Sequence, residues 1–155
     1  MALGYTPYKT PNAIFLLGSD LTDKEGYGVQ LVFGQQGKVD KATTTADVPY
    51  GIVTVGGPSE DGTYPGTVGA SAVEFVDAIG CVVQIAVSVN GGVNAGEFVL
   101  IDAAEANGTF TSTSNVTIVG GEWIWGLALT NAQPGEQCVM RFQPFVVQYV
   151  APPPP

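Results

Sequence analysis

Residues 123–142 read WIWGLALTNAQPGEQCVMRF. Two runs rich in aromatic, β-branched and other apolar residues, Trp123–Leu129 and Gln137–Phe142, flank a polar segment. That segment contains Pro134-Gly135, a pair that favours a turn because proline fixes its own φ and glycine tolerates φ values that other residues avoid. The stretch therefore predicts two β-strands separated by a turn.

The rest of the chain follows the same plan of short β-rich runs separated by Gly, Pro, Asn and Asp. This spacing is typical of an all-β protein, and we expect a small β-barrel or a β-sandwich. Only Lys41–Asp47 and Asp102–Ala106 could form helical turns, and both are too short to change the fold class. Further strands are predicted at Tyr27–Phe33, Tyr50–Val55, Val73–Ile79, Cys81–Val89, Phe98–Ile101, Val116–Val119 and Phe145–Tyr149.

Three short motifs occur twice in the same order, which predicts an internal repeat. We expect a single β domain over residues 13–150, built from two similar β-units at about 26–89 and 95–143 that cover each other's strand edges. Chance similarity among Gly- and Val-rich strands is the alternative. The matched motifs are Gly28-Val29-Gln30-Leu31 with Glu97-Phe98-Val99-Leu100, Tyr50-Gly51-Ile52-Val53 with Trp125-Gly126-Leu127-Ala128, and Cys81-Val82-Val83-Gln84-Ile85 with Cys138-Val139-Met140-Arg141-Phe142.

The two ends of the chain differ from this β body. Residues 1–12 contain two prolines and two tyrosines but no apolar periodicity, so we expect an extended N-terminal arm. Residues 151–155 end in four prolines, which favour polyproline II and cannot donate to a sheet. We expect a proline-rich tail outside the β domain.

The composition excludes several classes of function. The 155 residues carry a net charge of −9, which opposes binding to nucleic acid, and no histidine, which removes histidine-based catalysis. Four of the five basic residues precede position 42, and only Arg141 follows it. Apolar residues make up 45% and charged residues only 12%, so we expect a surface that contacts other proteins. No run approaches the ~20 apolar residues of a membrane helix, so we expect a protein made in the cytoplasm without a membrane partner.

Acidic pairs are the remaining candidates for catalysis, because glycosidases use two carboxylates on either side of a sugar. Glu60-Asp61 lies in a glycine-rich segment typical of an exposed loop, and Glu74 with Asp77 is the other close pair. The spacing of Asp20, Asp23 and Glu25 is not that of an EF-hand, and no phosphate-binding glycine loop occurs. We therefore predict that the protein is not an enzyme and needs no metal or other cofactor.

Two cysteines and two tryptophans are the remaining candidate functional residues. Cys81 and Cys138 do not form a CxxC pair, and we expect free thiols in the core or at a subunit interface. Trp123 and Trp125 lie two residues apart, on one face of a predicted strand. We expect them in the core or at a subunit interface too, with stacking on a sugar as the alternative.

The order of these motifs resembles that of a known family. Tyr50-Gly51-Ile52-Val53, Cys81-Val82-Val83-Gln84-Ile85 and the loop Asn90-Gly91-Gly92-Val93-Asn94-Ala95-Gly96 are followed by Trp125-Gly126-Leu127-Ala128 and Pro134-Gly135. Over about residues 13–143 the chain resembles the small β-rich head decoration proteins, or capsid cement proteins, of tailed bacteriophages. The matching motifs are turns and apolar strands rather than a set of chemically active residues.

The resemblance implies a structural virion protein. It would stand as a homotrimer on the outer surface of an icosahedral capsid and clamp neighbouring copies of the major capsid protein. Arms of this family often contact the shell, which here points to Leu3, Tyr5, Tyr8 and Lys9 as capsid-binding residues. A carbohydrate-binding β-module of a phage fibre and a tail-tube subunit are the alternatives, and a glycosidase ranks behind both.

Overall fold

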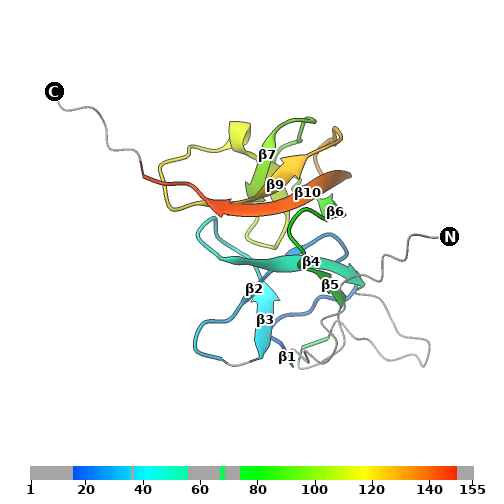
Figure 1. Ribbon diagram of the computed structural model, residues 1–155. Coiled ribbons are helices and arrows are strands. Elements are labelled where there is room, and N and C mark those ends of the chain that lie inside the picture. Colours follow the sequence, from blue (N-terminus) through cyan, green and yellow to red (C-terminus); the bar gives the residue numbers. More distant parts are fainter. Residues whose placement is uncertain (1–15, 36, 56–66, 69–73, 150–155) are drawn as a thin grey trace.

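The computed structural model describes residues 16–35, 37–55, 67–68 and 74–149. Over these residues the protein is all-β, with two five-stranded sheets stacked one above the other (Figure 1). The predicted fold class is confirmed. Each sheet ends in edge strands, so the described residues form a sandwich-like pair of open sheets and not a closed barrel. The predicted arm, the proline-rich tail and Glu60-Asp61 lie outside the described residues.

The first sheet has the strand order β1-β3-β2-β4-β5. Strands β1 and β3 run parallel and all other neighbours antiparallel. Strand β2 is central because both of its edges are paired, to β3 and to β4. The strands span Leu16–Leu17 (β1), Gly28–Leu31 (β2), Lys38–Lys41 (β3), Pro49–Val55 (β4) and Glu74–Val76 (β5).

The second sheet is antiparallel throughout and has the order β6-β10-β9-β7-β8. A single 3₁₀ turn, η1 (Thr113–Asn115), follows β8, with Ser112 capping it by accepting from the Ser114 N–H. The strands span Val82–Ala86 (β6), Phe98–Ile101 (β7), Phe110–Ser112 (β8), Trp123–Ala128 (β9) and Gln137–Val146 (β10).

Four consecutive strands in each half share one topology. Strands β2 to β5 lie in the order β3-β2-β4-β5, and strands β7 to β10 lie in the order β8-β7-β9-β10. Two of the three repeated motifs fall on strands that correspond in this way, β2 with β7 and β4 with β9. The two cysteine motifs do not correspond, because β6 and β10 are neighbours in one sheet, with Cys138 opposite Ile85. Strand β5 occupies the position that corresponds to β10.

The first sheet buries apolar side chains on both faces. Successive residues of a strand point to opposite faces, so Ile52 packs toward the second sheet while Val53 packs away from it. The larger core, between the sheets, contains Trp125, Phe110 and Phe142. A smaller core on the far face of the first sheet contains Leu17, Leu21, Val29, Val39 and Val53. The N-terminal β-unit is therefore covered on both sides.

Gly26 joins the two sheets through its backbone. Its N–H donates to the Val53 carbonyl of β4 at 2.7 Å, and its carbonyl accepts from the Ala86 N–H of β6 at 3.0 Å. The residue has a φ of +86°, and a Cβ at this position would lie 2.7 Å from the Ala86 nitrogen. Glycine is required here by both the backbone conformation and the close approach of β6.

Replacing Gly26 with Ala is expected to lower the free energy of unfolding by about 3 kcal/mol, because left-handed strain adds to a backbone clash. Gly80→Ala is the matched control, since Gly80 has a φ of +90° and a Cβ added there would meet no atom within 4 Å. The free energy of unfolding of this control should fall by only about 1 kcal/mol. Urea unfolding measures both variants, and equal losses would show that the Gly26 junction does not constrain the sheets.

The local predictions differ from the structure in detail. Val116–Val119 is not a strand, because the Glu122 carboxylate accepts hydrogen bonds from the N–H groups of Val119 and Gly120 and closes a loop there. Of the two candidate helical turns, Asp102–Ala106 does close one turn, because the Ala106 N–H donates to the Asp102 carbonyl at 2.9 Å, whereas Lys41 belongs to strand β3. Neither segment continues as a helix. The predicted strands at 137–142 and 145–149 are one strand, β10, whose register shifts between Phe142 and Phe145.

Candidate functional site

A buried polar cluster holds the loops at one end of the second sheet. Asp102, which follows β7, accepts hydrogen bonds at Oδ2 from Ser88 Oγ and from Asn90 Nδ2, the latter at 2.9 Å. Its Oδ1 accepts from the Ala104 N–H at 2.9 Å. Ser88 and Asp102 are buried. Glu105 extends the cluster by accepting from the Thr109 hydroxyl at 2.7 Å.

The hydrogen bonds of this cluster keep Asp102 ionised. Burial raises the pKa of its carboxyl, but the bonds from Ser88, Asn90 and the backbone N–H groups lower it by more, so the pKa lies below its ordinary value. The Ser88 hydroxyl donates to this carboxylate and is itself fully buried. A substrate cannot reach it, and the arrangement therefore serves to order the loops rather than to activate a nucleophile.

An open pocket of about 240 Å³ lies where β4 and β6 approach each other beside Gly26. Its lining combines Val53 and Thr54 of the first sheet with Val83 and Gln84 of the second, and Glu25 is its one ionisable group. A single carboxylate does not make the pair that glycoside hydrolysis requires. The pocket offers apolar and amide surface for a small contact but no catalytic set.

The outer face of the second sheet carries a row of side chains that crosses four strands, exposed except for the half-buried Leu127. Phe98 of β7 lies opposite Leu127 of β9, Leu127 lies opposite Arg141 of β10, and Arg141 lies opposite Val82 of β6. Residues directly opposite in a ladder project to the same face. Phe98 is 45% and Val82 50% exposed, whereas the neighbouring row, with Phe142, is buried in the core. We call the four residues the Arg141 row.

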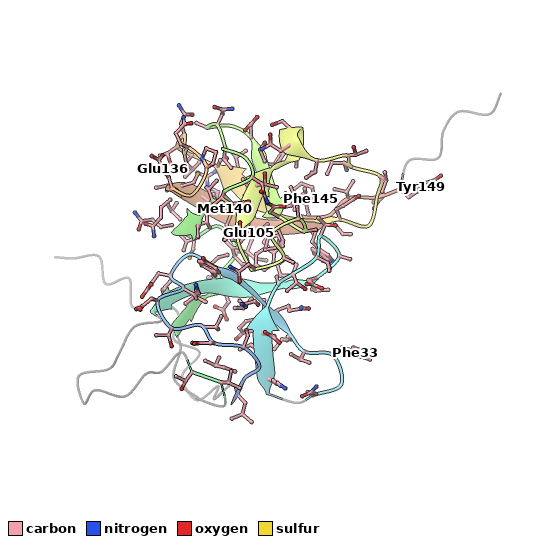
Figure 2. All side chains as sticks on the ribbon, turned by 180° about the vertical axis from the view of Figure 1, so that it is seen from behind. Phe33, Glu105, Glu136, Met140, Phe145 and Tyr149 are labelled. Atoms are coloured by element: carbon pink, nitrogen blue, oxygen red, sulfur yellow. The ribbon has the colours of Figure 1, made fainter. Side chains whose placement is uncertain are left out.

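A second apolar feature lies at the tip of the hairpin that joins β2 and β3. Phe33 is fully exposed there, next to Gly34, which has a φ of +74°. Figure 2 shows the Phe33 side chain pointing away from the body, and Tyr149 likewise near the end of the second sheet. Isolated exposed apolar residues are common, but a phenylalanine without any cover on a tight turn suits a partner's pocket.

The structure places the four predicted interface or core residues in different surroundings. Trp125 is fully buried, with its ring 5.2 Å from Phe110 and 6.4 Å from Phe142 between ring centroids, while Trp123 packs partly buried against the same core. Cys138 is buried and donates to the Thr130 carbonyl at 3.1 Å, whereas Cys81 is half-buried. Both thiols are free.

The arm residues Leu3, Tyr5, Tyr8 and Lys9 lie outside the described residues, so their role as capsid-binding residues stays a prediction. Asp20 accepts from the Thr22 N–H at 2.9 Å in a turn, and that hydrogen bond lowers the pKa of its carboxyl. In the parts of the chain that the structure describes, no three His, Cys, Asp or Glu residues lie close enough to hold a metal ion. None of the described helices is long and apolar enough to span a membrane.

The sequence alone singles out neither the Arg141 row nor Phe33 as a site. Arg141 is the only basic residue after residue 41, which could have marked it as a candidate contact residue. The row itself depends on the register of three strand ladders, which cannot be predicted from the sequence. No family model matches the chain, and no curated protein matches it.

Proposed function

We propose that this chain is a structural virion protein that binds the outside of an icosahedral capsid of a tailed bacteriophage as a homotrimer and stabilises the shell. Its partners are the major capsid protein and further copies of itself. Three points support the proposal: the resemblance of the motif order to head decoration proteins, a compact all-β body, and apolar side chains exposed at separate places on it.

The full exposure of Phe33 is the main structural support for the proposal. The hairpin that presents it is ordered by its own ladder, in which Leu31 pairs with Val39, and by the Val32 N–H, which donates to the Lys38 carbonyl at 2.9 Å. The ladder and this hydrogen bond fix the base of the hairpin, and the ring points away from the body. A buried aromatic anchor of this kind commonly dominates the affinity of an interface.

The N-terminal arm provides a second proposed contact, which rests on its sequence. An extended segment can add a strand to an exposed sheet edge, with Leu3, Tyr5 and Tyr8 anchored in pockets and Lys9 on an acidic group. Ordering a dozen residues costs on the order of 10 kcal/mol of backbone entropy or more. Three arms of a trimer offset this together, because each later contact forms at high effective concentration.

Replacing Phe33 with Ser is expected to weaken capsid binding at least about tenfold, or roughly 1.4 kcal/mol, because the anchor is lost. The thermal midpoint should stay unchanged, since the side chain is fully exposed in the free protein. Co-sedimentation with purified expanded capsids of tailed phages measures the binding. A chain beginning at Ala13 should show a similar loss while still folding.

Val48→Ser is the control for the loss of one exposed apolar side chain in the same half of the molecule. It should bind as the unchanged protein does. Equal binding of Phe33→Ser and the unchanged protein would remove the hairpin from the capsid contact, and equal binding of the shortened chain would remove the arm.

A further inference from the structure

The Arg141 row is bordered by further uncharged side chains. Leu129, which directly follows β9, donates its N–H to the Val139 carbonyl, and Val139 lies opposite Gln84 of β6. At the other side of the row, the rings of Phe98 and Phe145 meet edge to face, with centroids 5.5 Å apart. The described outer face of these strands is therefore largely apolar, with Arg141 as its one charge.

No described residue pairs with the charge of Arg141. Among the described residues, none accepts a hydrogen bond from its guanidinium or forms an ion pair with it, and the residues opposite it on the two neighbouring strands are Leu127 and Val82. An arginine set among apolar side chains can cover apolar surface with its stem and offer its planar head to a carboxylate. Such arginines are enriched among the residues that dominate interfaces.

We infer that the Arg141 row is the surface by which one copy of this chain binds a second copy, with Arg141 pairing with a carboxylate of the neighbour. The inference rests on the homotrimer of the proposed function and names the face that forms it. A ring of three requires a head-to-tail contact, in which one patch meets a different patch of the next copy. The row supplies one of these two patches.

Charge complementarity favours a second copy as the occupant. The chain has 14 acidic and 5 basic residues, so a second copy offers a lone arginine many more carboxylates than like charges. Arg141 is also the only base in residues 42–155, so no other basic side chain of the C-terminal unit can serve this role.

The test is sedimentation velocity of the full chain over a concentration series, with Arg141→Glu as the principal variant. The unchanged protein should sediment as a trimer, and Arg141→Glu should raise the dissociation constant by about 100-fold because a like charge replaces the complementary one. Arg141→Lys should weaken association less, because it keeps the charge without the bidentate head. Lys38→Glu changes the net charge equally on the first sheet and should associate as the unchanged protein does.

Two outcomes would overturn the inference. The first is that the unchanged protein stays monomeric up to about 100 µM, because a specific assembly would have a much lower dissociation constant. The other is an Arg141→Glu variant that is folded by its thermal midpoint and still trimeric. Capsid co-sedimentation tests the proposed function separately from this inference. If self-association depends on Arg141 but the protein binds no capsid, the self-interface stands and the capsid role fails. If Arg141→Glu loses capsid binding but not self-association, the row faces the shell and the inference fails.

Discussion

Replacing Trp125 with Ala is expected to lower the free energy of unfolding by about 4 kcal/mol and the thermal midpoint by roughly 10 °C. The indole is fully buried and contacts both Phe110 and Phe142, so its removal leaves a cavity between the two sheets. Chemical denaturation followed by circular dichroism measures the change. A loss below about 1 kcal/mol would mean that the two sheets are not held by a common core.

Trp125→Phe is the matched variant that separates the ring from its N–H group. Among the described residues, no acceptor lies within hydrogen-bonding distance of the buried Trp125 Nε1. An unpaired buried donor is itself unfavourable, so its removal offsets part of the lost apolar contact. We expect Trp125→Phe to lower the free energy of unfolding by less than half as much as Trp125→Ala does. An equal decrease would show that the indole N–H is hydrogen-bonded in solution.

Replacing Asp102 with Ala is expected to lower stability by about 3 kcal/mol, because Ser88 Oγ and Asn90 Nδ2 lose their common acceptor inside the loop cluster. Unfolding in urea at neutral pH measures the effect. Asp102→Asn keeps the size of the side chain but removes the charge, and it should also be destabilised. A neutral effect of both substitutions would contradict the structural role assigned to the cluster.

The same carboxyl predicts a dependence of stability on pH. Its pKa in the folded protein lies below the ordinary value of 3.8, so the ionised form contributes stability that is fully present above that value. This contribution is lost as the pH falls through the folded-state pKa. The difference in stability between the unchanged protein and Asp102→Asn should therefore shrink as the pH falls below 3.8, and a difference that stays constant on acidification would contradict the assignment.

The strands that the sequence predicts well are those with several adjacent apolar residues. Phe98–Ile101 has the predicted bounds, and β4 and β9 differ from their predictions by one residue at one end. The strands that the sequence does not predict are short, from two residues in β1 to four in β3. Lys38–Lys41 has one buried apolar side chain, Val39, and forms a strand because β2 pairs beside it, so its structure comes from its neighbour and not from its own residues.

Pairing across the sheets is the part that local patterns could not supply. The polar strand Phe110–Ser112 is fixed by its ladder with β7, and strand β10 continues through Gln143-Pro144 because a register shift absorbs the missing proline N–H. The Arg141 row has the same origin, since three separate ladders bring its four residues into line. The arm residues are proposed from a resemblance and lie outside the described residues.

Binding of the full chain to assembled shells is the decisive measurement for the proposed capsid role. Purified expanded capsids of tailed phages are mixed with the protein at increasing concentration and pelleted, and the bound protein is quantified per capsid. The account predicts saturable binding at concentrations up to about 10 µM, with three chains at each occupied three-fold or quasi-three-fold position. Folded protein that stays in the supernatant with every capsid tested would contradict it.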